Sequence, residues 1–136
     1  MTAVSTRPLS ASTDALLRFA LRADATVTGL AGLAAAAFAN PLSTLSGLSP
    51  NTEYLLGTAF VFYGLAVYYL AALPSLRGVG IGVSAANAVC TVATIALVLT
   101  DAAPLTEAGI AVTMATGVYT AFFAYLQYLG VRRLRA

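Results

Sequence analysis

Five polar side chains inside otherwise apolar stretches are the residues of this chain that could do chemistry. One is an acid, and the others are two amides and two phenols: Asp24, Asn87, Gln127, Tyr63 and Tyr119. A charged residue at the centre of a membrane costs about 2.5–3.5 kcal/mol even on insertion scales, so an acid near that depth needs partners. Arg22 lies two residues from Asp24 and faces another direction on a helix, so we expect those partners on other helices. A buried phenol also needs a hydrogen-bond partner, and we therefore expect Tyr63 and Tyr119 to face the interior.

Counting along the chain places the two amides at different depths. Asn87 lies ten residues past Arg77, or roughly 15 Å along a helix axis, and so near the midplane of a membrane. Gln127 lies five residues before Arg132 and is shallower. Together with Asp24 they could line a polar pocket that opens toward the cytoplasm. Two interpretations stay open: the three side chains are hydrogen-bond links between helices, or they form a site for a ligand or a proton.

Missing residue types exclude several kinds of chemistry. The chain has no His, no Lys and a single Cys. It therefore lacks the usual ligands of haem, zinc, copper and iron, and it cannot form a Schiff base. No nucleophile has a base beside it. We expect no metal, no cofactor and no enzymatic activity.

The composition indicates a membrane protein. The 136 residues are 60% hydrophobic and only 9% charged, whereas a soluble domain carries about 25% charge. The net charge of +2 is too small to suggest nucleic acid as a partner. The length of the chain predicts a single domain, residues 13–136. We expect residues 1–12 to be a disordered cytoplasmic tail.

Four hydrophobic segments must position these side chains, at about residues 14–39, 54–73, 79–100 and 107–131. The two later connections are short, which makes neighbouring segments antiparallel. All arginines fall before the apolar part of the first segment, between the second and third segments, or after the fourth, whereas the other two connections carry only acids. Because loops rich in Arg and Lys stay in the cytoplasm, the sequence predicts an all-α, polytopic membrane protein. It is an antiparallel bundle of four transmembrane helices with both termini cytoplasmic.

The first segment and the connection after it leave alternatives open. The purely apolar part, residues 25–39, is short for a bilayer that needs about 20 residues. The turns that carry Arg18 and Arg22 must complete it, with both side chains reaching the headgroups. A cleaved signal peptide is the alternative, because residues 37–39 match A-x-A. Leucines at every third position from Leu42 to Leu48 indicate a short helical turn in the outer interface, or an irregular loop.

Small residues predict where the helices touch. In lipid, helices associate where such residues let two backbones approach closely. The third segment carries Gly78, Gly82 and Ala86 at four-residue spacing, and the fourth carries Gly109 and Gly117. We expect both stripes to pack helices within one chain, with self-association of two copies as the alternative.

Several local strings resemble a group of small bacterial four-span integral membrane proteins without assigned activity. They are Arg22-Ala23-Asp24, Thr28-Gly29-Leu30 and Leu126-Gln127-Tyr128-Leu129-Gly130, the last followed by arginines. The group is similar in architecture to DoxX-type membrane proteins. The resemblance implies a four-helix fold in a bacterial inner membrane, and it carries no catalytic residue over.

These observations favour a non-catalytic membrane protein, an accessory or structural subunit of a membrane complex that binds lipid or quinone between its helices. The expected partners are the lipid bilayer, other membrane subunits or a second copy, and no nucleic acid. The alternative is a small proton- or cation-coupled transporter that uses Asp24. The chain looks like small multidrug transporters in size, span count and first-helix acid, but it has no Trp and its acid lies close to arginines.

Overall fold

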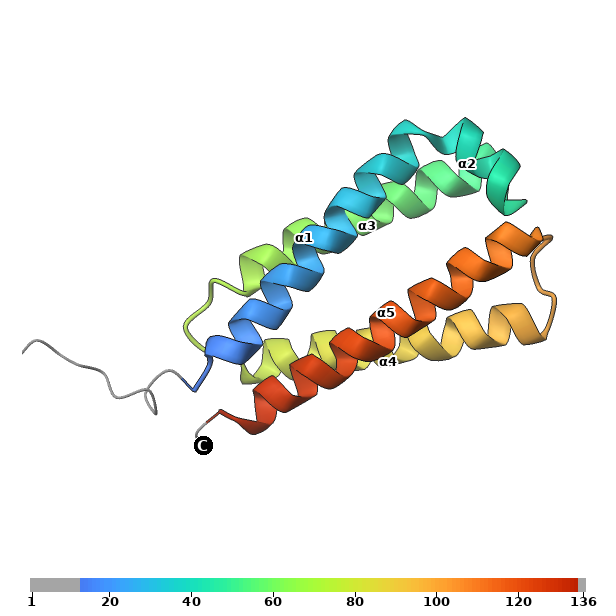
Figure 1. Ribbon diagram of the computed structural model, residues 1–136. Coiled ribbons are helices and arrows are strands. Elements are labelled where there is room, and N and C mark those ends of the chain that lie inside the picture. Colours follow the sequence, from blue (N-terminus) through green and yellow to red (C-terminus); the bar gives the residue numbers. More distant parts are fainter. Residues whose placement is uncertain (1–12, 135–136) are drawn as a thin grey trace, which may run out of the picture.

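The computed structural model describes residues 13–134, which form five helices joined by short connections (Figure 1). The helices are α1 (Ala15–Ala37), α2 (Ala39–Ser46), α3 (Pro50–Leu70), α4 (Arg77–Leu99) and α5 (Glu107–Arg132). No strand occurs between residues 13 and 134. The expected tail at residues 1–12 lies outside the described residues.

The long helices have the size and composition of membrane spans. α3, α4 and α5 are each long and apolar enough to cross a membrane, and α1 with α2 adds a fourth if this bent pair counts as one span. α1 alone has 23 residues, or about 34 Å of helix, but Arg18, Arg22 and Asp24 lie within it. The chain therefore has the helices of a multi-pass membrane protein.

A sharp bend separates α1 from α2. α1 ends at Ala37, α2 begins at Ala39, and the two axes differ by 95°. Pro41 explains the break, because its ring would clash with the carbonyl of residue 37 in a continuous helix. The segment that contains Leu42 and Leu45 is therefore helical, and the alternative prediction of an irregular loop is wrong. α2 ends at Gly47, whose φ of 89° is in the left-handed region that favours glycine.

Hydroxyl caps start the two helices at this end of the bundle. Ser49 accepts a hydrogen bond from the backbone N–H of Thr52 at 3.1 Å, with Pro50 as the first residue of α3. Thr106 caps α5 in the same way through Gly109, at 3.0 Å. The backbone N–H of Thr106 also donates to the carbonyl of Ser46, at 3.0 Å. α2 is therefore docked on the start of α5.

The helices form two pairs, α1 with α3 and α4 with α5 (Figure 1). α1 also packs on α5, whereas α3 and α4 hardly touch although they follow one another in the chain. We call the end where α1 and α4 begin the basic end, and the opposite end the α2 end. The buried apolar core gathers at the basic end, around Leu17, Leu21, Val67, Leu76 and Val131.

Glycines let α1 and α3 approach to backbone contact. A Cβ added to Gly57 would lie 2.5 Å from the backbone N of Ala36 and 2.5 Å from the carbonyl oxygen of Gly32. A Cβ at Gly64 would lie 2.6 Å from the carbonyl oxygen of Ala25. All three distances are far inside van der Waals contact, so only glycine permits this spacing.

The stripe predicted on α4 does not pack as expected. A Cβ at Gly78 or Gly82 would meet no atom within 4 Å, and Ala86 lies beside a cavity described below. The packing glycine of α4 is Gly80, where a Cβ would lie 2.6 Å from a methyl group of Val131. The physical reason is the packing of Leu17 and Val131 against Gly80, which lies with Asn87 on the buried face of α4.

The two glycines predicted on α5 do lie in helix contacts. Gly109 meets the carbonyl of Ser46 in α2, and a Cβ at Gly117 would lie 2.5 Å from the hydroxyl of Thr94 in α4.

Candidate functional site

Asp24 is the centre of a hydrogen-bond network that joins all four long helices. Its side chain is fully buried and accepts five hydrogen bonds. Oδ1 accepts from the hydroxyls of Thr28 at 3.0 Å and Tyr119 at 2.9 Å. Oδ2 accepts from the hydroxyl of Tyr63 at 2.9 Å, Nδ2 of Asn87 at 2.8 Å and Nε2 of Gln127 at 2.9 Å.

The two amides are fixed by each other as well as by the acid. Nδ2 of Asn87 donates to Oε1 of Gln127 at 3.0 Å in addition to Asp24. Each amide therefore has one possible orientation, because a carboxylate can only accept. Among residues 13–134 the one ion pair joins Arg18 and Asp14, so the charge of Asp24 is met by neutral donors alone. Charge-assisted hydrogen bonds of this kind are about twice as strong as neutral ones.

The structure brings all five sequence-derived polar residues to one point. Asp24 comes from α1, Tyr63 from α3, Asn87 from α4, and Tyr119 and Gln127 from α5. Thr28, the sixth member of the network, was not predicted. Its spacing could have indicated it, because Thr28 lies four residues after Asp24 and hence on the same face of α1.

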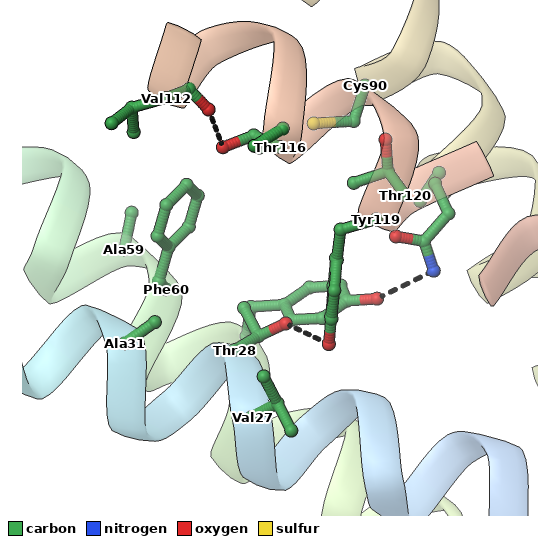
Figure 2. A pocket seen from close by; sticks show the side chains of 14 residues that line it. Val27, Thr28, Ala31, Ala59, Phe60, Cys90, Val112, Thr116, Tyr119 and Thr120 are labelled. Atoms are coloured by element: carbon green, nitrogen blue, oxygen red, sulfur yellow. Dashed lines mark hydrogen bonds between the residues drawn. The ribbon is translucent and has the colours of Figure 1, made fainter. Parts of the chain in front are cut away.

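A cavity of about 580 Å³ lies between the two helix pairs, directly beside this network. Thr28, Tyr63, Asn87 and Tyr119 line its polar floor. The walls are mostly small and apolar, and Figure 2 shows α1 and α3 side chains such as Ala31 and Phe60 facing Val112 and Thr116 of α5 across it.

The cavity lies on the opposite side of Asp24 from the one expected. Between the network and the basic end, Leu17, Leu21 and Val131 fill the bundle. The wall residues instead lie toward the α2 end, and the small wall residues Ala59 of α3 and Ala86 of α4 are exposed. Val27 of α1 and Val112 of α5 are exposed as well, so the cavity opens sideways between the two helix pairs. Counting residues gives depth, but it does not show on which side of the acid the bulky side chains pack.

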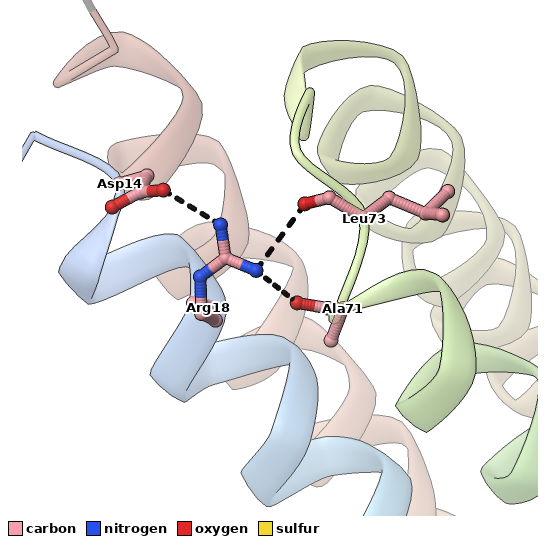
Figure 3. Close-up of polar contacts among 4 residues, drawn as sticks. All are labelled: Asp14, Arg18, Ala71 and Leu73. Atoms are coloured by element: carbon pink, nitrogen blue, oxygen red, sulfur yellow. Dashed lines mark hydrogen bonds and ion pairs between the residues drawn. The ribbon is translucent and has the colours of Figure 1, made fainter.

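Arg18 stabilises the basic end of the bundle (Figure 3). Its guanidinium pairs with Asp14 at 2.7 Å and donates to the carbonyls of Ala71 at 2.5 Å and Leu73 at 3.3 Å. It thereby joins the start of α1 to the end of α3, rather than only reaching toward headgroups. Arg22 lies over the ring of Tyr68, 5.9 Å from its centre.

Comparison of the chain with protein-family models, curated proteins and solved structures finds no match. The similarity to DoxX-type membrane proteins stays an expectation. The function has to be argued from the Asp24 network and the cavity beside it.

Proposed function

We propose that this protein crosses a bacterial inner membrane four times, with both ends cytoplasmic, and binds an amphiphilic small molecule of the bilayer without transforming it. The ligand class is a lipid or quinone-like amphiphile, held between the two helix pairs. The observation that carries the proposal is the cavity of about 580 Å³ with apolar walls and a polar floor beside Asp24.

The volume of the cavity supports an occupant. Ligand sites measure about 300–1,000 Å³, and this one falls within that range. Its wall residues Ala59, Ala86 and Val112 are exposed, so in a bilayer the cavity is open to the acyl chains and a molecule of the membrane can enter it.

The distribution of polarity supports an amphiphile. Polar groups gather at one end of the cavity, at Thr28, Tyr63, Asn87 and Tyr119, and the rest of the lining is mostly apolar, apart from Thr116 and Thr120. A head group at the floor and an apolar body along the walls match this arrangement. The floor hydroxyls do contact a base, the carboxylate of Asp24, but that carboxylate is fully buried behind the floor and already accepts five hydrogen bonds, which favours binding without chemistry. The role of accessory subunit in a larger membrane complex stays a prediction, and it predicts a partner protein that co-purifies.

Native mass spectrometry of the chain extracted from membranes in mild detergent tests the proposal. We expect a lipid-sized molecule to stay bound. Ala115→Phe places a ring in the cavity and should remove the adduct. Ala121→Phe, an exposed position on the same helix outside the cavity, should keep it. A chain free of any bound molecule, or an adduct equally retained by both variants, would count against binding in this cavity.

A second candidate is a proton- or cation-coupled transporter, and the absence of a cation at Asp24 among the described residues favours it. A carboxylate held only by neutral donors can exchange a proton or a cation without first breaking an ion pair. In proteoliposomes, Asp24→Asn should then abolish ion-coupled uptake. Uptake that is unchanged in this variant would remove Asp24 from such a mechanism.

A further inference from the structure

The floor of the cavity has its donor hydrogens turned away from the cavity. The hydroxyls of Tyr63 and Tyr119 donate to Asp24, each at 2.9 Å, and Thr28 donates to it at 3.0 Å. Nδ2 of Asn87 has two hydrogens, and these go to Asp24 and to Gln127. Each donor of the floor is therefore already used by the network behind it.

The atoms left for a ligand are oxygen lone pairs. Oδ1 of Asn87 accepts no hydrogen bond from any residue between 13 and 134, since the contacts of this side chain are made through Nδ2. Yet within the same residues no buried side-chain oxygen or nitrogen lacks a partner. Oδ1 is therefore accessible, and the accessible surface of Asn87 lines the cavity. The hydroxyl oxygens of Tyr63 and Tyr119 also keep lone pairs for further bonds.

We propose that the ligand carries a hydrogen-bond donor at its polar end, a hydroxyl or a protonated amine on an apolar body. This inference rests on the proposed function and specifies the head group that the floor accepts. A head group with only carbonyl or ether oxygens would bring lone pairs against lone pairs and leave Oδ1 of Asn87 without a partner. An anionic head would in addition be repelled by Asp24.

The same reasoning predicts which form of a quinone, the oxidised or the reduced one, binds more tightly. A hydroquinone carries two hydroxyl donors, whereas the quinone formed from it carries only acceptors. The floor therefore fits the reduced form better than the oxidised form. A protonated amine gains attraction from the buried charge, although Asp24 lies behind the floor and does not itself line the cavity.

Native mass spectrometry of the unmodified full chain in micelles, with four matched probes, tests the inference. Dodecanol and dodecylammonium carry a donor, dodecyl methyl ether is dodecanol with its donor removed, and dodecanoate is an anion. We expect the ether and the anion to bind at least about tenfold more weakly than dodecanol, a difference of about 1.4 kcal/mol. Tighter binding of dodecylammonium than of dodecanol identifies a cationic head, and the reverse order identifies a neutral hydroxyl.

Tyr119→Phe provides a second measurement, because it removes one floor oxygen and should reduce the preference for dodecanol over the ether. Tyr125→Phe is the matched control on the same helix, where the side chain is 63% exposed and outside the cavity. Ether binding as tight as alcohol binding would overturn the donor inference and leave the cavity proposal standing. If none of the four probes binds, both are overturned.

Discussion

The hydrogen bond between Asp24 and Gln127 gives the sharpest test of the buried network. Both side chains are fully buried, and Nε2 of Gln127 lies 2.9 Å from Oδ2 of Asp24. Asp24→Leu removes the acceptor, Gln127→Leu removes the donor, and the double variant removes both. These variants form a double-mutant cycle. Both variants that lack Asp24 gain stability because they no longer bury a charge, and this shared gain cancels when the coupling energy is calculated.

The size of the coupling follows from what each variant leaves unpaired. Asp24→Leu takes the acceptor from Gln127, Asn87 and Tyr63, whereas Gln127→Leu removes the bond to Asp24 and also the bond that its Oε1 accepts from Asn87. The Asp24–Gln127 bond is lost in each single variant, but the double variant loses it only once. Such a bond to a charged acceptor is worth at least about 1.5 kcal/mol, so the double variant should cost about 1.5 kcal/mol less than the sum of the two single variants, which is a coupling of about 1.5 kcal/mol. This is near the upper end, about 1.7 kcal/mol, for polar contacts in membrane helices.

Reversible unfolding in mixed micelles with increasing SDS measures the four free energies. The control cycle pairs Asp24→Leu with Thr100→Val, whose hydroxyl bonds only to Ala96 of its own helix at the far end of α4. That cycle should be additive within about 0.5 kcal/mol. If the Asp24–Gln127 cycle is equally additive, the charge of Asp24 is not held by Gln127 and the description of the network is wrong.

Three further predictions concern the scaffold. Gly57→Ala should destabilise the bundle by about 1–3 kcal/mol, because its Cβ would overlap the backbone of α1. The control Gly82→Ala adds a Cβ that faces open space, and it should leave the SDS midpoint of unfolding unchanged or raise it. Arg18→Gln should speed amide exchange at residues 71–76, because it removes the donors to Ala71 and Leu73, and Arg18→Lys should restore protection only in part. Thr106→Ala should cost about 1 kcal/mol and expose the amide of Gly109 to exchange, and unchanged protection would contradict the cap.

The helices and the members of the polar network could be predicted because lipid imposes strict rules on both. A backbone in lipid has to be helical, so runs of apolar residues give the spans to within a few residues. A polar side chain in lipid has to find another, and this rule predicted the grouping of Asp24, Asn87 and Gln127, although counting placed the two amides at different depths and the structure brings both to Asp24.

The rotation of α4 and the position of the cavity could not be predicted in this way. Gly78 and Gly80 both offer a small residue, and spacing alone does not show which of them faces a neighbour. The answer depends on Leu17 of α1 and Val131 of α5, which occupy the space against Gly80. The cavity likewise depends on how far the two helix pairs diverge, and α1 of one pair, together with α2, contacts α5 of the other. These are properties of packing between distant segments, and no local pattern records them.

The buried polar residues were expected either to link helices or to form a ligand site, and the same side chains can do both. Asp24 joins the helix pairs where apolar packing ends, since the core lies on its basic side and the cavity on the other. To satisfy its charge, Asp24 draws in the hydrogens of Tyr63, Tyr119 and Asn87, and the oxygens of these side chains are what remains for the cavity. A neutral residue at position 24 would free those hydrogens. The carboxylate that holds the bundle together therefore also sets which head groups its cavity accepts.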